Sequence, residues 1–310
     1  MYKSEHVACA TRALEYASEA LRGDPELVLA VVQQDGLALE YASEALRGDL
    51  EVVLASVQQN GLALEYASET LKADHAVVLA AVQQDGWALM YASEALKADR
   101  AIVLAAVQQD GWALMYATST LRADAAIVLV AVQKYGDALE LADTYLRSKH
   151  EVVLAAVQKH GRALKYASHA LQADRTIVLA AVRQYGDALF DAAEALQADR
   201  EVVRAAVEQS GRALMCAAKE LRADATIVTA AVRKDGVAIF YASEALQADE
   251  WLQLLARGLS SRLPARARAF LKLARDQADA AVQSQVDLFL IKNDLADWIS
   301  AKKAKATAKA

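Results

Sequence analysis

The chain has 310 residues, of which 55% are apolar and 24% charged, and its formal net charge is -6. An acidic chain of this kind excludes a protein whose whole surface grips nucleic acid or anionic lipid. The two cysteines, Cys9 and Cys216, are too few for a disulfide framework or a cysteine-based zinc module. The N-terminus lacks an apolar signal core, and no apolar run approaches the roughly 18 residues of a membrane span. We therefore expect a soluble intracellular protein, cytoplasmic by default with an organelle left open, and no membrane insertion.

Glycine and aspartate recur along the chain with a fixed period of 25 residues. Residues 1–11 are a degenerate half unit with Thr11 in the glycine position, and Lys149 is the single substitution in the aspartate series. Such a period is typical of a tandem-repeat architecture. The glycines are Gly36, Gly61, Gly86, Gly111, Gly136, Gly161, Gly186, Gly211 and Gly236, and the aspartates are Asp24, Asp49, Asp74, Asp99, Asp124, Asp174, Asp199, Asp224 and Asp249.

Each unit is predicted to contain two helices. In residues 37–61, apolar residues spaced three and four apart predict an amphipathic helix from about Leu37 to Arg47. Asp49 stands where an N-cap belongs. The second helix, from Val52 to about Gln59, is apolar nearly all round and should be buried between neighbours. Gly61 is expected to end this helix as a left-handed C-cap.

Helices this short are unstable alone, so the units must stack. The sequence predicts an all-α fold, an α-solenoid of 25-residue helix-turn-helix repeats with a C-terminal helical cap. A leucine-rich repeat is disfavoured because its LxxLxL strand pattern is missing. We expect a repeat array over residues 1–249 with nine to ten units, capping helices over 250–300, and a Lys/Ala-rich tail over 301–310.

Two segments carry a resemblance to a known family: ALEYASEAL at residues 38–46 and ADRAIVLAAVQQDG at 98–111. Over residues 12–249 the chain resembles the tandem helical-repeat family catalogued as domain of unknown function 4116. The resemblance implies an array of helical units with no assigned catalytic activity. The sequence departs from the pattern at Leu141, Asp191 and Cys216 in the tyrosine column and at Lys149 in the aspartate column.

Columns that change residue type between units are free of core packing and available for specificity. The first position of the first helix and the position three residues later form two such columns. In the first units these columns predict a contiguous apolar stripe for protein interaction, made of Leu37, Leu62, Trp87, Met90, Trp112 and Met115. From Asp137 to Arg212 the charges alternate between units, which favours carboxylate–guanidinium pairs across each inter-unit contact. The alternative is that these columns simply fill an adjacent layer.

Other repeated residues have structural explanations. The aspartates could form a row of cation ligands but fit N-caps better, and the tyrosines fit spacers between units better than base-stacking platforms. Histidines at 6, 75, 150, 160 and 169 show no metal-ligand spacing, and we find no nucleophile elbow, phosphate loop or paired-acid motif. Cys216 is expected to be a buried thiol. We expect no enzyme, no catalytic residue, no cofactor and no metal.

The period stops at Glu250. Trp251, Leu252, Leu254 and Leu255 could form an apolar lid, and Pro264 then opens a predicted basic helix. Residues 250–310 hold 11 Lys/Arg and 6 Asp/Glu, a net of +5, so residues 1–249 hold a net of -11. The main hypothesis is a non-enzymatic adaptor, scaffold or assembly subunit whose partner is another protein. Nucleic-acid binding through the basic C-terminal region and an enzyme with a pocket assembled from several repeats are the alternatives. The residues of the possible basic contact are Arg266, Arg268, Lys272 and Arg275.

Overall fold

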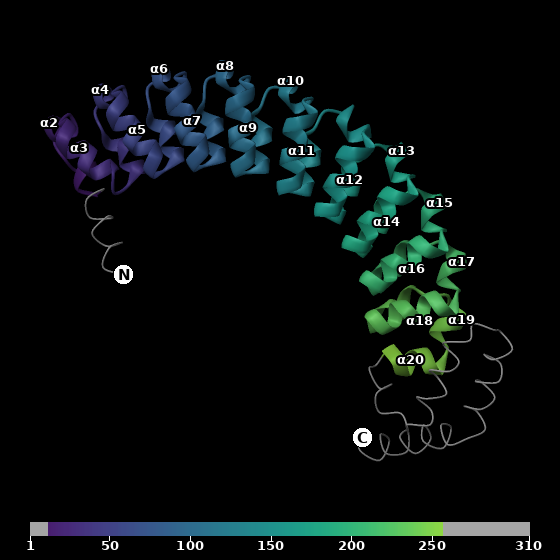
Figure 1. The fold of residues 1–310 in the computed structure, drawn as a ribbon. Helices are drawn as coiled ribbons and strands as arrows, with labels where there is room; N and C mark the ends of the chain where they lie inside the picture. Colours follow the sequence, from purple (N-terminus) through teal and green to yellow (C-terminus); the bar gives the residue numbers. More distant parts are fainter. Residues whose placement is uncertain (1–11, 257–310) are drawn as a thin grey trace, which may run out of the picture.

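The computed structural model describes residues 12–256, which form a curved array of helices with no strand among them (Figure 1). From Gly36 onward each unit contains a six-residue 3-10 helix, a short helix and a long α-helix, and the short helix is a single α-helical turn in all of these units but one. In one unit these are η1 (Gly36–Tyr41), α4 (Glu44–Arg47) and α5 (Leu50–Gln59). The all-α solenoid with a 25-residue period is therefore confirmed.

The same three elements recur along the array. The other 3-10 helices are η2 (Gly61–Tyr66), η3 (Gly86–Tyr91), η4 (Gly111–Tyr116), η5 (Gly136–Leu141), η7 (Gly161–Tyr166), η8 (Gly186–Asp191), η9 (Gly211–Cys216) and η10 (Gly236–Tyr241). The other short helices are α2 (Glu19–Arg22), α6 (Glu69–Lys72), α8 (Glu94–Lys97), α10 (Ser119–Arg122), η6 (Leu146–Ser148), α13 (His169–Gln172), α15 (Glu194–Gln197), α17 (Lys219–Arg222) and α19 (Glu244–Gln247). The other long helices are α3 (Pro25–Val32), α7 (His75–Gln84), α9 (Arg100–Gln109), α11 (Ala125–Lys134), α12 (His150–Lys159), α14 (Arg175–Gln184), α16 (Arg200–Gln209) and α18 (Ala225–Lys234).

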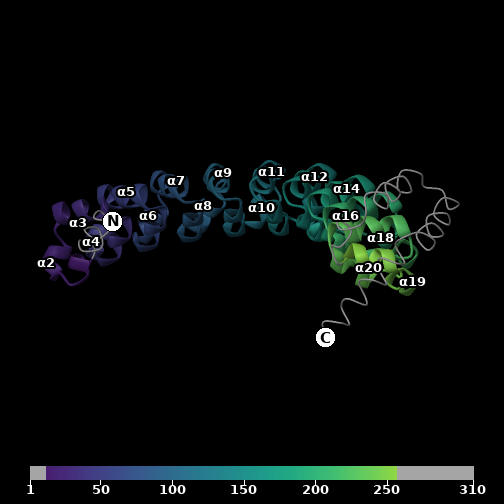
Figure 2. The same ribbon diagram turned by 90° about the horizontal axis from the view of Figure 1, so that it is seen from below.

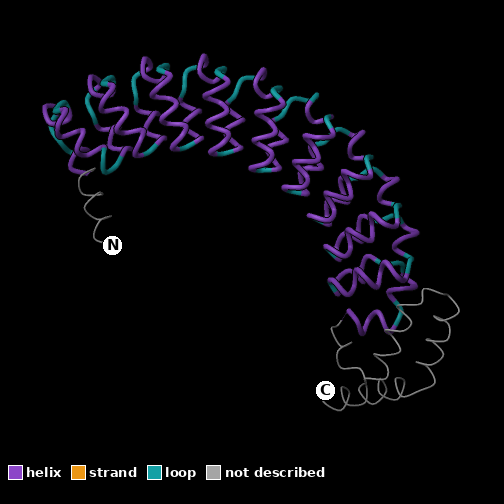
Figure 3. Tube along the Cα trace, in the orientation of Figure 1, coloured by secondary structure: helices purple, strands orange, loops and turns teal. Residues whose placement is uncertain are grey.

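The units stack into two layers. Long helices pack on the long helices of adjacent units, and 3-10 helices pack on 3-10 helices, with each inner long helix touching the 3-10 helices on both sides of it in the chain. The short helices follow the outer edge of the arc, and the second view separates them from the row of long helices (Figure 2). Turns lie along both edges (Figure 3). A long helix of ten residues therefore spans about 15 Å from the outer edge to the inner edge.

The expected uninterrupted first helix from Leu37 to Arg47 is wrong. Ala42 is extended, with φ -68° and ψ 155°, and separates the 3-10 helix from the short α-helix. This break lets the Ser43 N–H donate to the Arg22 carbonyl of the preceding unit at 2.9 Å. The same bond recurs at the equivalent residues of every following unit up to Ser243. A continuous helix would bury this N–H in its own hydrogen-bond ladder and lose the connection between units.

The aspartate N-caps are confirmed. The Asp49 carboxylate accepts hydrogen bonds from the Glu51 and Val52 N–H groups at 3.0 and 3.1 Å, and the helix begins at Leu50, two residues before the expected start. A second series of caps, which sequence reasoning missed, starts the 3-10 helices: its members are Asp35, Asn60, Asp85, Asp110 and Asp235, each accepting from the N–H two residues ahead.

The glycines have a different role from the one expected. None of them in the described residues has a left-handed φ, and Gly61 begins a 3-10 helix instead of ending the long helix. A Cβ added at Gly111 would lie 2.6 Å from the Ala131 carbonyl oxygen of the next unit. Glycine is required because two backbones approach closely there, and the expected left-handed C-cap is wrong.

The core is one continuous cluster that runs through all described units. In each unit the third and fourth residues of the 3-10 helix are buried, and Ala38 and Leu39 have no exposed surface. They pack against valines and isoleucines of the long helices, such as Val53 and Val57, which are also fully buried. Since each unit buries its apolar side chains mainly against its neighbours, the array is stable only as a stack.

One unit lacks its cap, and restoring the cap is expected to stabilise the array. Lys149 makes no side-chain cap for α12, and its Nζ instead lies 4.0 Å from the centre of the Tyr145 ring. Lys149→Asp should raise the free energy of unfolding by about 1 kcal/mol, the usual contribution of an N-cap. Urea unfolding followed by circular dichroism measures this. The matched control Asp174→Lys removes the cap of the next unit and should lower stability; equal midpoints for both variants would contradict the account.

The last described helix, α20 (Glu250–Ala256), takes the place of a further long helix. It packs against α18 and η10 with Leu252 buried, and the Ala256 carbonyl lies over Gly236 as Ala231 lies over Gly211. The rest of the expected caps at 250–300, the tail at 301–310 and the basic residues lie outside the described residues. Those basic residues are Arg266, Arg268, Lys272 and Arg275.

Candidate functional site

The second and fifth residues of the 3-10 helices face solvent along one side of the array, and we call these two columns the 3-10 stripe. Their residues are exposed or half-buried, because the first, third and fourth residues of each helix lie against the stack. Even the least exposed candidates, Leu62 and Trp112, are only half-buried. The stripe therefore lies at the surface, and no further layer of the described chain covers it. The other candidate residues are exposed: Leu37 37%, Trp87 38%, Met90 37% and Met115 45%.

The most exposed apolar residues of the 3-10 stripe lie in its C-terminal half, outside the predicted set. They are Phe190 at 71%, Met215 at 56%, Val237 at 48% and Phe240 at 72% exposed. All four residues occupy the same two columns, so their exposure could have been predicted from the sequence. The charged residues that alternate with them favoured ion pairing as the interpretation of this half instead. The apolar stripe therefore continues to the end of the array, interrupted by charged units.

Side chains in the first column of the stripe contact the following unit, at the residue just before the glycine that begins its 3-10 helix. The Trp87 indole N–H donates to the Asp110 carboxylate at 2.9 Å, and Trp87 also packs edge-on against Tyr116 with ring centres 5.8 Å apart. This contact holds one tryptophan of the stripe in a fixed orientation, which lowers the entropy lost when a partner covers it.

The carboxylate–guanidinium pairs expected between the two variable columns of neighbouring units are wrong. Such pairs join neighbouring units at the starts of the long helices instead, as between Arg100 and Asp124 at 2.9 Å. Within residues 12–256, Asp137 pairs with His160 at 2.8 Å, and Arg162 donates to the Tyr185 hydroxyl at 3.1 Å, but no ion pair joins Asp137 to Arg162. The second residue of a 3-10 helix reaches a residue 23 positions ahead, as it does in both of these contacts.

The repeated tyrosines connect adjacent 3-10 helices. The Tyr91 side chain is half-buried and hydrogen-bonds Glu65 of the preceding unit, and Tyr66 does the same with Glu40. Burial, together with the hydrogen bond and the negative charge of Glu65, raises the pKa of Tyr91 to about 12. The spacer role is consistent with this packing, but the hydroxyl meets a glutamate of a 3-10 helix and not a loop.

The raised tyrosine pKa values predict a loss of stability at high pH. The pKa of Tyr91 in the folded chain, about 12, exceeds the ordinary value near 10 of an unfolded chain. The contribution of the protonated Tyr91 hydroxyl to the free energy of unfolding is therefore complete below about pH 10 and is lost as the pH rises toward 12. The melting temperature of Tyr91→Phe should fall less over this range than that of the parent. Leu141 occupies the same column, so the hydroxyl is not needed for packing; parallel pH curves would contradict the assignment.

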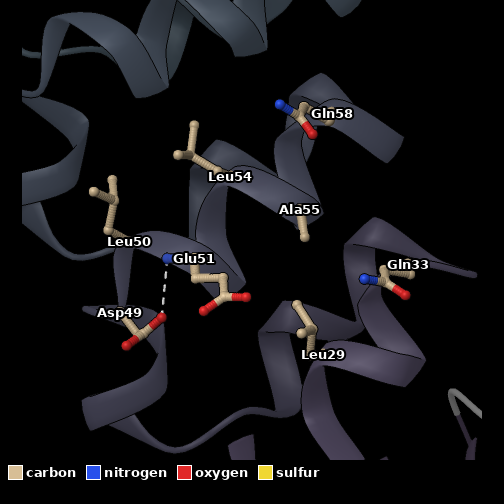
Figure 4. Close-up of a pocket in the computed structure, with 8 residues that line it drawn as sticks. All are labelled: Leu29, Gln33, Asp49, Leu50, Glu51, Leu54, Ala55 and Gln58. Carbon is tan, nitrogen blue, oxygen red and sulfur yellow. Dashed lines mark hydrogen bonds between the residues drawn. The ribbon is translucent and has the colours of Figure 1, made fainter. Parts of the chain in front are cut away.

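The opposite side of the array presents the long helices. Leu54 and Ala55, the fifth and sixth residues of α5, are only partly buried, although sequence reasoning placed this helix wholly inside. A shallow hollow of about 550 Å³ lies between α3 and α5 and is open to solvent (Figure 4). Its lining residues are Leu29, Gln33, Asp49, Leu50, Glu51, Leu54, Ala55 and Gln58.

Two further properties of the described residues concern chemistry: the reactivity of the Cys216 thiol and the grouping of side chains that could hold a metal ion. Burial, aided by Asp187 and Asp191, raises the pKa of the half-buried Cys216 thiol and so disfavours the reactive thiolate. Within residues 12–256 no group of three or more His, Cys, Asp or Glu side chains is placed to hold a metal ion. None of the helices in this part of the chain has the length and apolar character needed to cross a bilayer.

Five consecutive segments match the family described as domain of unknown function (DUF4116). The chain belongs to this family. The matched segments are residues 9–47, 49–97, 99–147, 150–197 and 199–247. The longer DUF4116 segments cover about two 25-residue units each, so the family pattern is a pair of structural repeats. No curated protein and no solved structure matches the chain.

Proposed function

We propose that this DUF4116 chain is a non-enzymatic protein-interaction solenoid, an adaptor, scaffold or subunit of a larger assembly, which binds another protein along the 3-10 stripe. The observation that carries this proposal is the exposure of large apolar side chains at the two variable columns of the 3-10 helices, from Leu37 to Phe240. Exposed apolar surface of this kind is typical of interaction sites.

The chemistry of the stripe supports a protein partner. Tryptophan and methionine are enriched at protein interfaces, since Trp contributes a large rigid surface and Met adapts to its neighbour. Trp87, Met90 and Met115 lie on adjacent 3-10 helices that are held together by packed backbones. The charged units at Asp137 and Arg162 then add selectivity for the partner's charge pattern.

Affinity capture from an extract of the source organism tests the proposal. The variant Trp87→Arg/Trp112→Arg places arginine at the second position of two 3-10 helices. Arg162 and Arg212 already occupy this position in other units, so the variant is expected to fold. The parent should recover a stoichiometric protein partner, and the double variant should lose it. Circular dichroism checks that the variant is folded.

A charge-matched control isolates the stripe. His75→Arg/Ala225→Arg adds the same residue type at the first position of two long helices, where Arg100, Arg175 and Arg200 occur naturally. This control should keep the partner. Retention of the partner by the tryptophan variant would rule out the stripe as its site, and salt-sensitive recovery of nucleic acid alone would favour the basic C-terminal region.

A further inference from the structure

The aromatic part of the 3-10 stripe contains an indole N–H group without an acceptor. In η3 the Trp87 indole N–H donates to the Asp110 carboxylate at 2.9 Å. In the next unit Tyr135 takes the position of Asp110, so a carboxylate is missing there. Among residues 12–256 the Trp112 indole N–H has no acceptor, and it remains open to solvent. A hydrogen-bond donor within an apolar surface suits a partner that supplies the acceptor.

Aromatic rings surround this donor along the stripe. Trp87 is 38% exposed and packs edge-on against Tyr116. Tyr135 is 45% exposed, and its ring lies beside Gly111, since a Cβ built on that glycine would be 3.2 Å from the ring atom Cδ2. Aromatic-lined surfaces bind polyproline II segments. Such a segment has no internal hydrogen bonds, so its carbonyl groups can accept from the Trp112 N–H, whereas those of a helix are already occupied.

The spacing of the units matches the repeat of a polyproline II chain. Trp87 and Trp112 occupy the same position of η3 and η4, which pack side by side. Stacked helices lie roughly 8–10 Å apart, and three residues of polyproline II advance about 9.3 Å. That chain completes one turn in three residues, so every third side chain faces the same way. A β-strand repeats on one face about every 6.6 Å and would lose register after one unit.

The stripe is acidic on both sides of the tryptophans. In η1 to η5 its two columns contain four carboxylates and no basic residue. Glu65 belongs to the unit just before the tryptophans, and Asp137 and Glu140 belong to the unit just after them. The basic Arg162 and Lys165 of the following unit end this acidic segment. A partner that follows the stripe here therefore needs basic residues three positions before and three positions after its central pair of contacts.

We propose that the tryptophan units bind a basic, proline-rich segment in the polyproline II conformation, with the pattern Arg-x-x-Pro-x-x-Pro-x-x-Arg. Its prolines lie over Trp87 and Trp112, and its arginines lie next to Glu65 at one end and next to Asp137 and Glu140 at the other. The two arginines are about 28 Å apart in this conformation, and the outer members of four stacked units are roughly 27 Å apart. This proposal names the chemistry of the partner and rests on the proposed function of the 3-10 stripe.

Fluorescence anisotropy of a labelled peptide, titrated with the full chain, tests the proposal. The probe is Arg-Ala-Pro-Pro-Ala-Pro-Pro-Ala-Pro-Arg. Its control, Ala-Arg-Pro-Pro-Ala-Pro-Pro-Ala-Arg-Pro, has the same composition and charge, but its arginines are off the face that carries the two central prolines. The probe should bind at least about tenfold more tightly than the control. Equal binding would overturn the proposal, because an acidic array attracts both peptides alike.

A charge exchange at one end of the segment gives a second test. Asp137→Arg/Glu140→Lys introduces the pair that Arg162 and Lys165 already form in the next unit, so the variant is expected to fold, which circular dichroism checks. This variant should bind the probe at least about tenfold more weakly, and it should prefer a probe in which glutamate replaces one of the two arginines. An unchanged preference would overturn the proposed register.

The unpaired indole N–H has its own test. Trp112→Phe keeps an aromatic ring and removes the donor, so it should weaken probe binding about 2–10-fold more than Trp87→Phe does. Trp87→Phe is the matched control because its N–H is already bonded to Asp110. Equal affinities for the two variants would contradict a hydrogen bond from Trp112 to the peptide.

Affinity capture distinguishes this proposal from the proposed function. A captured protein that is lost in Trp87→Arg/Trp112→Arg, together with no binding of the probe by the parent, would refute the proline-rich class alone and leave the 3-10 stripe as a site. A captured protein that is retained by that variant would refute the stripe itself.

Discussion

Gly136→Ala is expected to lower the free energy of unfolding by about 3 kcal/mol, the upper part of the range for overpacking. The added methyl would press on the Ala156 carbonyl oxygen and on His160 of the next unit, both held by stacked helices. A backbone carbonyl cannot rotate away as a flexible side chain can, so the two units must separate. Urea unfolding monitored by circular dichroism measures the loss.

Gly48→Ala is the matched control for this prediction. A Cβ there would make only ordinary contacts, the nearest being the Ala45 carbonyl at 3.4 Å, and other units carry Ala73 or Ala98 at this position. Alanine should therefore stabilise the chain by about 0.5–1 kcal/mol, because it restricts the unfolded backbone. If both glycines respond alike, close approach between units is not what requires Gly136.

Leu39→Ala is expected to cost about 2–5 kcal/mol, since Leu39 is fully buried between layers and its truncation leaves a cavity. Neighbouring units share the cavity, so hydrogen exchange should quicken in η1 and also in the adjacent α3 and α5. Denaturant unfolding and exchange monitored by mass spectrometry together test this result.

Leu37 lies in the same 3-10 helix and gives the comparison. It is 37% exposed, so Leu37→Ala should change stability by less than about 1 kcal/mol and leave exchange in α3 unaffected. A large loss at Leu37 would mean that the second column is part of the core, which would also weaken the case for the 3-10 stripe.

Much of the fold could be predicted because its determinants are local. Asp49 caps residues two and three positions ahead, so its role is visible in a single unit. The break at Ala42 could not be predicted in this way, because the Ser43 N–H finds its acceptor at Arg22, 21 residues earlier. Likewise, what limits Gly111 is a carbonyl at Ala131 in another unit.

For a related reason, only part of the candidate site could be predicted from the sequence. Columns that change residue type, such as Trp87 and Asp137, identify themselves as surface positions within the sequence. The fifth residues of the long helices do not, since Leu54 is the same residue type as the buried Leu39 and its column stays leucine for seven units. Only the stacking geometry distinguishes the half-exposed leucine from the buried one.

The glycine contacts also bear on how the array bends. Each of the nine glycines from Gly36 to Gly236 begins a 3-10 helix and lies against the backbone of the next unit, while hydrogen bonds such as Ser43 to Arg22 join the units at the short helices along the outer edge of the arc. We expect the glycine contacts to set the shorter of the two spacings, and the difference then accumulates into curvature. A chain with alanine at several of these glycines, if it folds, should straighten, so small-angle scattering would record a longer maximum dimension for the same number of residues.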